Sequence, residues 1–128
     1  MGLDMYLVRG PKGETTIDSE EVGYWRKANA VHNWFAQNCQ NGVDECQYTT
    51  VPKEKLEELL NICKQVLADE LSTDTAERLL PVTAGFFFGS YAYDEWYYDK
   101  VRNTQEILEA VLADTDFETD EIGYQSSW

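Results

Sequence analysis

The stretch DEWYYDKVRNTQEILEAVLAD, residues 94–114, is the strongest structural signal in the chain. Asp94 suits the N-cap of a helix, because its carboxylate can accept a backbone N–H bond from the first turn. Beyond it, four positions recur at helical spacing and predict one buried stripe, widened by two flanking residues. The stripe is formed by Val101, Thr104, Leu108 and Val111, with Ile107 and Leu112 beside it. We therefore expect a long amphipathic helix that requires a second layer to cover it.

Three consecutive rings open this helix, and they cannot all belong to its buried face. Successive residues of a helix are turned by about 100°. Tyr97 aligns with the stripe, Tyr98 falls on the side expected to face solvent, and Trp96 lies on a flank near Lys100. These rings end the segment GFFFGSYAYDEWYYD, residues 85–99, in which eight of fifteen residues are aromatic and the three Phe predict a strand. We therefore expect at least one of these rings to lie at the edge of the core, partly exposed to solvent.

The chain before residue 52 predicts strands and one helix. LDMYLV, residues 3–8, has the composition of a strand and is followed by the breaker GPKG, while ETTID, residues 14–18, is a weaker strand. YWRKANAVHNWFAQNC, residues 24–39, repeats apolar residues at helical spacing, and Asn41-Gly42 is its natural stop. CQYTTV, residues 46–51, predicts a further strand.

Pro52 suits the first turn of another helix, because its missing N–H costs nothing there. The apolar face of that helix comprises Leu56, Leu59, Leu60, Cys63, Val66 and Leu67. A short helical turn at 75–80 and a final strand or hairpin arm within DFETDEIGYQSSW, residues 116–128, complete the pattern. The sequence predicts a single α+β domain, 1–128, with about three helices packed on a short, mostly antiparallel sheet.

Composition limits the partners. The chain has 24 acidic against 10 basic residues, a net charge of −14, and such a field repels phosphate backbones, which argues against direct nucleic-acid binding. The acids serve either solubility or attraction to basic grooves of other proteins. We expect no membrane association, since no apolar run has spanning length. Three cysteines do not suit a secreted disulfide framework, so we expect a cytoplasmic protein.

Metal binding is a candidate that the spacing disfavours. His32, Cys39 and Cys46 are zinc-binding types, and Asp44 or Glu45 would have to supply a fourth ligand. Structural zinc sites normally use close pairs such as CxxC, and the sequence contains none. We expect neither a metal nor another cofactor.

Catalysis is likewise disfavoured, although the sequence leaves it open. A cysteine thiolate with His32 as its base lacks a known signature, and Cys63 falls in the leucine face of a predicted helix. Asp94, Glu95 and Asp99 could act as acid and base, but capping and solvated charge are the commoner roles. We favour a protein without enzymatic activity.

The segment YWRK places Arg26 and Lys27 near a predicted helix N-terminus in an otherwise acidic chain. Arginine among aromatic residues is typical of binding hot spots and anion pockets, with ordinary surface charge as the alternative. The candidates to line such a pocket are Tyr24, Trp25, Arg26, His32, Tyr91, Tyr93, Trp96 and Tyr98.

Four blocks of the sequence resemble a family of small, largely uncharacterised proteins of tailed bacteriophages and prophages. They are MGLDMYL, YWRKANAVHNWF, LLPVTAGFFFGSYAYDEWYY and the terminal YQSSW, and they span nearly the whole chain in order. The resemblance implies no activity, cofactor or site residue. It implies a context, an accessory protein in the cytoplasm of an infected bacterium, and the loop at 10–20 looks shorter than in that family.

The leading hypothesis from the sequence is a non-enzymatic phage accessory protein that binds and inhibits a bacterial host or defence protein with a basic groove. Exposed aromatic residues of the segment 91–98 would anchor it, and acids would steer it: Asp114, Asp116, Glu118, Asp120 and Glu121. The alternative is a small-ligand binder or minor enzyme with an aromatic and arginine pocket, and a structural role in the virion is third. The sequence leaves the oligomeric state open, a homo-oligomer included.

Overall fold

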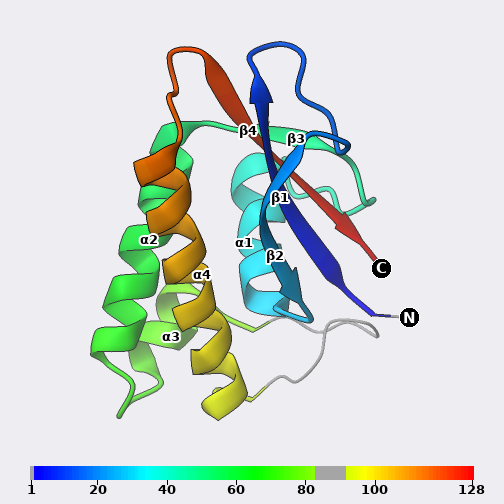
Figure 1. Cartoon of the computed structure of the whole chain (residues 1–128). Coiled ribbons are helices and arrows are strands. Elements are labelled where there is room, and N and C mark those ends of the chain that lie inside the picture. Colours follow the sequence, from blue (N-terminus) through cyan, green and yellow to red (C-terminus); the bar gives the residue numbers. More distant parts are fainter. Residues whose placement is uncertain (1, 83–91) are drawn as a thin grey trace.

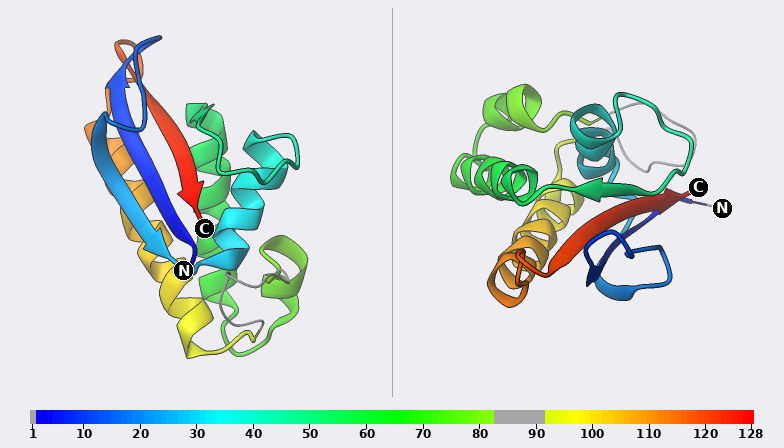
Figure 2. Two further views of the ribbon diagram at one scale, coloured as in Figure 1. Left: turned by 90° about the vertical axis from the view of Figure 1, so that its right-hand side faces the viewer. Right: turned by 90° about the horizontal axis from the view of Figure 1, so that it is seen from above.

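A computed structural model describes residues 2–82 and 92–128 and shows an antiparallel sheet of four strands with helices on one face (Figures 1 and 2). The strands are β1 (Asp4–Pro11), β2 (Glu20–Arg26), β3 (Thr49–Val51) and β4 (Asp120–Ser127). Their order in the sheet is β2-β1-β4-β3, and every pairing is antiparallel. The predicted α+β class is confirmed, and so is the final strand.

The sheet brings the two ends of the chain together. Asp4 of β1 lies opposite Ser127 of β4, and the register continues to Pro11 opposite Asp120. Both ends therefore emerge at the same corner of the sheet (Figure 1). Because β4 lies between β1 and β3, the last segment of the chain is an interior strand of the sheet.

The described residues form four helices, where the sequence predicted about three and a short helical turn. They are α1 (Asn29–Cys39), α2 (Lys53–Ala68), α3 (Asp74–Leu79) and α4 (Glu95–Asp114). The predicted cap of α4 is confirmed, since the Asp94 carboxylate accepts a bond from the Tyr97 N–H at 3.1 Å. Its predicted stripe is buried as well, from Val101 to Val111. None of the helices in the described part of the chain is long and apolar enough to cross a membrane.

The core is built on aromatic contacts between sheet and helices. The rings of Phe35 on α1 and Tyr124 on β4 stack with centroids 4.1 Å apart. Trp25 of β2 meets Phe35 edge-on and donates its indole N–H to the Thr104 hydroxyl of α4 at 2.7 Å. Thr104 in turn donates to the Lys100 carbonyl, so this polar pair needs no water inside the core. Together these contacts attach α1 and α4 to the inner face of the sheet.

Several boundaries differ from those predicted. Residues 24–26 belong to β2 and not to the first helix, because they pair with β1 and alternate between exposed and buried positions. The predicted strand at 14–18 is wrong: side-chain bonds link Thr16, Asp18 and Ser19 within a turn, and the strand starts at Glu20. The strand predicted at 46–51 shortens to β3, after Cys46 at φ 60°. The strand predicted from the three Phe of 86–88 lies outside the described residues.

The prediction that Tyr98 faces solvent is also wrong. Its side chain is 7% exposed, and its ring packs edge-on against Tyr97 with centroids 5.0 Å apart. Burial, with the nearby carboxylate of Glu70, raises the pKa of Tyr98 above its ordinary value. The helical wheel failed here because α2 packs along α4 and widens the covered face of α4 beyond the sheet-facing stripe.

Candidate functional site

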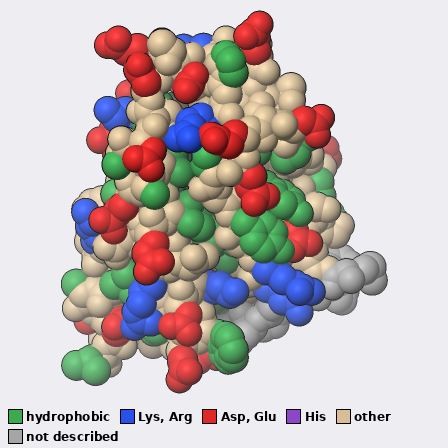
Figure 3. Space-filling model, in the orientation of Figure 1, with side chains coloured by type: hydrophobic (Ala, Val, Ile, Leu, Met, Phe, Trp, Pro, Cys, Tyr) green, Lys and Arg blue, Asp and Glu red, His purple; other side chains and the backbone are tan. Residues whose placement is uncertain are grey.

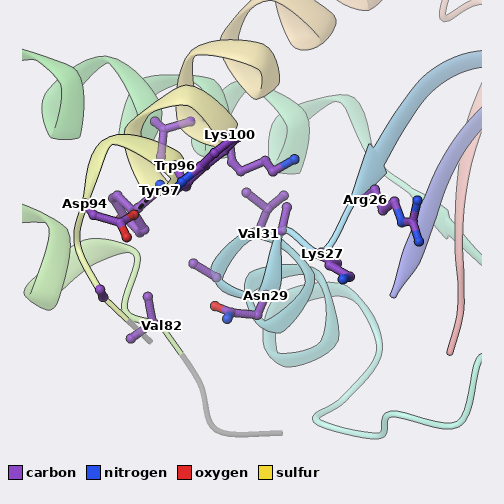
Figure 4. A pocket seen from close by; sticks show the side chains of 13 residues that line it. Arg26, Lys27, Asn29, Val31, Val82, Asp94, Trp96, Tyr97 and Lys100 are labelled. Carbon is purple, nitrogen blue, oxygen red and sulfur yellow. Dashed lines mark hydrogen bonds between the residues drawn. The ribbon is translucent and has the colours of Figure 1, made fainter. Parts of the chain in front are cut away.

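A pocket of about 420 Å³ lies between the junction of β2 with α1 and the first two turns of α4 (Figure 4). Its size falls in the range of small-molecule sites. The floor is apolar and made by the first turn of α1 together with α4. The residues that form it are Ala28, Ala30, Val31, Tyr97 and Val101.

Three basic residues line this pocket: Arg26 at the end of β2, Lys27 directly after it, and Lys100 on α4. In the described ranges 2–82 and 92–128, none of the three has a carboxylate within ion-pair distance. In Figure 3, basic side chains gather on the part of the molecule where α4 begins. A chain of net charge −14 therefore concentrates three of its ten basic residues around one pocket.

The backbone at Lys27 is held in the left-handed region, at φ 57°. A non-glycine residue adopts this region at a cost, and such residues cluster at functional sites. The conformation ends β2 and turns the chain into α1 within two residues. The Lys27 N–H donates to the Leu3 carbonyl at 2.7 Å, which fixes the turn to the start of the chain. The turn is what brings Lys27 to the pocket.

The first turn of α1 adds a further positive element. Its N-cap position is Ala28, and among the described residues no side chain caps this end and no acid lies in its first turn. The N-terminus of a helix carries partial positive charge from its N–H groups. Asn29, Ala30 and Val31 line the pocket from this turn. Both the basic side chains and the helix end favour a negatively charged occupant.

The other end of the pocket is aromatic. Trp96 is 70% exposed, whereas the next residue, Tyr97, is buried and donates its hydroxyl to the Leu80 carbonyl at 2.7 Å. Burial raises the pKa of the Tyr97 hydroxyl, which keeps it a neutral donor. Among the described residues that line the pocket, one is acidic, Asp94, and its carboxylate is already engaged as the cap of α4. Trp96 and Lys100 are one turn apart on α4 and share its pocket side (Figure 4).

Of the candidate pocket residues predicted from the sequence, the structure brings Arg26 and Trp96 together at this pocket. Tyr24 lies on the opposite face of the sheet, where its hydroxyl donates to Asp4 and raises the pKa of Tyr24. Trp25, His32 and Tyr98 are core residues. Tyr93 is half-buried, and its hydroxyl oxygen accepts a bond from the Val82 N–H at 3.2 Å. Tyr91 lies outside the described residues.

His32 belongs to a buried network at the end of β4. It is 1% exposed, with Nδ1 2.6 Å from the Tyr124 hydroxyl and Nε2 2.8 Å from Asp44. The Trp128 indole donates to the same Asp44 oxygen at 3.0 Å. Both ring nitrogens of His32 thus have protein partners. Within the described ranges no three metal-ligating side chains come together, so Cys39 and Cys46 do not join His32 in a cluster.

The thiols of Cys39 and Cys63 are poor nucleophiles. Burial raises the pKa of Cys39 to about 11 and that of Cys63 to about 12. Cys63 is fully buried on the inner face of α2, as its place among leucines predicted. A thiol with so high a pKa is almost entirely protonated at neutral pH, and the thiolate is the reactive form.

The predicted steering acids lie at the far end of α4 from the pocket. Asp114 is the last residue of the helix, Asp116 and Glu118 are exposed in the turn that follows, and Asp120 and Glu121 begin β4. Eighteen residues separate Trp96 from Asp114, which at 1.5 Å per residue is about 27 Å. Glu121 also accepts the Gly13 N–H at 3.1 Å, so one of the five has a structural role.

Sequence reasoning missed Lys100 and the first turn of α1 as parts of the pocket. Lys100 could have been found, because it follows Trp96 by four residues and therefore shares a helix face with it. Residues 29–31 line the pocket because α1 begins at Asn29. The sequence pattern predicted that this helix begins at residue 24, which places its N-terminus elsewhere.

The comparisons with known proteins identify no relative. The phage resemblance therefore stays an expectation from the sequence, and the chemistry of the pocket is the basis for a function. No protein-family model matches this chain, and no curated protein or solved structure matches it.

Proposed function

We propose that this chain is a non-enzymatic binding protein that holds an anionic ligand in the pocket between α1 and α4. The observation that carries this proposal is that Lys27 and Lys100 line an apolar pocket at the first turn of α1, and that among the described residues neither has a carboxylate within ion-pair distance. Basic residues in an acidic protein ordinarily find acidic neighbours. Two that line one pocket without an ion pair in the described part of the chain are best explained by a negatively charged ligand.

The net charge of the protein does not prevent such binding. Salt screens charges over about 8 Å at physiological ionic strength, so the acids at the far end of α4 act only weakly at the pocket. Locally the ligand would meet the ammonium groups of Lys27 and Lys100 and the positive end of α1. The overall field slows the approach of an anion, while the local charges determine how long it stays.

The test is an NMR titration of the 15N-labelled chain with pyrophosphate. We expect the amide signals of residues 29–31 to shift with a common dissociation constant. Lys100→Gln should weaken binding severalfold, because one of the two ammonium groups that line the pocket is lost. Lys64→Gln, an exposed lysine of α2 outside the pocket, is the matched control and should bind as the parent does. Shifts scattered over the surface, or equal effects of both variants, would rule out the proposal.

A second candidate function is the one expected from the phage resemblance, inhibition of a bacterial protein through its basic groove. The observation that favours it is a group of exposed acids, Asp114, Asp116 and Glu118, at the end of α4 that lies away from the pocket. Such an end can steer the chain toward a basic surface.

This function is tested by affinity capture from bacteria that express the chain, with the captured protein then purified for binding kinetics. Neutralising Asp116, Glu118 and Asp120 together should slow association and flatten its salt dependence. Trp96→Ala is the comparison, and it should mainly speed dissociation if the ring anchors the partner. If neither the triple neutralisation nor Trp96→Ala altered the binding kinetics of the captured protein, this function would not be supported.

A further inference from the structure

We infer, on the basis of the proposed anion binding, that the ligand carries a phosphate at one end and a flat aromatic ring at the other. This is the chemistry of a nucleotide. The inference rests on two unlike features of the pocket lining, the ammonium groups and an exposed indole that lies beside Lys100 (Figure 4). A simple inorganic anion would use only the first of these features.

The aromatic end is an open stacking surface. Trp96 stays 70% exposed although the adjoining Tyr97 and Tyr98 are buried, and the Trp96 side chain lies along the pocket beside Lys100. Every nucleobase presents a flat face, and base stacking on an aromatic side chain contributes to affinity without needing a particular hydrogen-bond pattern. The apolar floor at Val31 and Val101 would contact the body of the ligand.

The basic end suits a phosphate better than a carboxylate. A phosphate group carries up to two negative charges and three acceptor oxygens, so it can be shared by several donors approaching from different sides. Lys27 directly follows β2, Lys100 comes from α4, and the first turn of α1 adds its positive end. Two ammonium groups and a helix N-terminus line the part of the pocket where one such group would be held.

A free nucleotide fits better than the end of a nucleic-acid strand. A strand would extend its phosphates from the pocket over a surface whose formal charge is −14 overall, and each additional phosphate would be repelled. A mononucleotide places its charge only at the basic end. Purines should bind more tightly than pyrimidines, because their larger rings cover more of the indole.

The experiment compares five ligands by isothermal titration calorimetry and tryptophan fluorescence: adenosine 5′-monophosphate, adenosine, ribose 5-phosphate, pyrophosphate and a 5′-phosphorylated oligothymidylate of six nucleotides. The mononucleotide should bind about tenfold or more tightly than ribose 5-phosphate and than adenosine, because each of these lacks one end of the ligand. It should also quench fluorescence, and the oligonucleotide should bind more weakly. Equal binding of the mononucleotide and ribose 5-phosphate would overturn the inference while leaving the proposed anion site intact. If none of the five ligands bound, both the nucleotide inference and the proposed anion site would be wrong.

Two tryptophan variants assign the ring contact. Trp96→Leu should reduce the affinity for the mononucleotide about tenfold, abolish the quenching and leave the affinity for pyrophosphate unchanged. Trp128→Leu is the matched control, because Trp128 is also partly exposed but contacts Asp44, away from the pocket. It should change neither affinity. A mononucleotide that binds Trp96→Leu as tightly as the parent would disprove stacking on this ring.

Discussion

Gly123 of β4 lies directly against the side chain of Tyr48. A Cβ placed there would lie 2.1 Å from the Tyr48 hydroxyl oxygen and 2.3 Å from Cζ of that ring. We therefore expect Gly123→Ala to destabilise the protein by about 1–3 kcal/mol, as overpacking does, and to lower Tm by roughly 4–12 °C. Thermal unfolding followed by circular dichroism measures this. In a Tyr48→Ala background the cost should nearly vanish, and a cost that persisted would point to backbone strain at Gly123 instead.

At Lys27 the backbone conformation costs stability, while the charged side chain is expected to contribute to ligand binding. Its left-handed φ of 57° is comfortable for glycine, so Lys27→Gly should leave Tm unchanged or raise it, by up to about 1 kcal/mol of stability. The same change removes a pocket cation and should weaken pyrophosphate binding severalfold. Lys27→Gln keeps the backbone cost and loses the charge, so it should match the glycine variant in binding but not in Tm. A fall in Tm for Lys27→Gly would mean that the side chain packs in a stabilising way.

The strand β4 is the element on which the sheet depends. It pairs with β1 on one side and β3 on the other, and it carries Tyr124, which stacks on Phe35 and contacts His32. Deleting residues 124–128 should therefore abolish the native fold, seen as loss of dispersion in the amide NMR spectrum. Trp128→Ala removes only the last ring and its bond to Asp44, so it should fold with Tm lowered by a few degrees. A truncated chain that kept its dispersed spectrum would show that β4 is dispensable.

A helix could be predicted from the sequence where a single periodicity dominated, as in α2 and α4. The structure confirms the apolar stripes of both helices. The boundary between β2 and α1 was not, because residues 24–26 match both a helical and an alternating pattern, and only pairing with β1 decides between them. The same uncertainty affected the site. Arg26 and Trp96 were identified from residue type alone, whereas their meeting depends on the turn at Lys27 and on α4 crossing the end of β2.

At the scale of the whole molecule, buried thiol and phenol groups with raised pKa values make the stability of the fold sensitive to high pH. Burial raises the pKa of Cys39 from 9.0 to about 11 and that of Cys63 to about 12, and it raises the pKa of Tyr97 and Tyr124 as well. Below pH 9 these thiols are protonated in both the folded and unfolded chain, so their contribution to stability is constant. Above pH 9 the unfolded chain loses protons that the folded chain retains, and stability falls until about pH 12.

Urea unfolding at intervals between pH 8 and pH 11 should show this decline. Cys63→Ala should flatten it relative to the variant's own stability at pH 8, because one of the groups responsible is gone. The cavity left by the sulfur lowers the whole curve but not its slope. An identical slope in the parent and the variant would show that Cys63 does not take part.

The pairing of Asp4 with Ser127 has a consequence for how the chain could be rewired. The start and finish of the polypeptide sit on neighbouring interior strands, so a few glycines could join them without disturbing the sheet. New ends could be cut at Leu71, a fully exposed residue between α2 and α3. Such a circular permutant should fold to the same structure, with β1 and β4 turned into a covalent hairpin. The order of the elements along the chain would change, while their order in space would not.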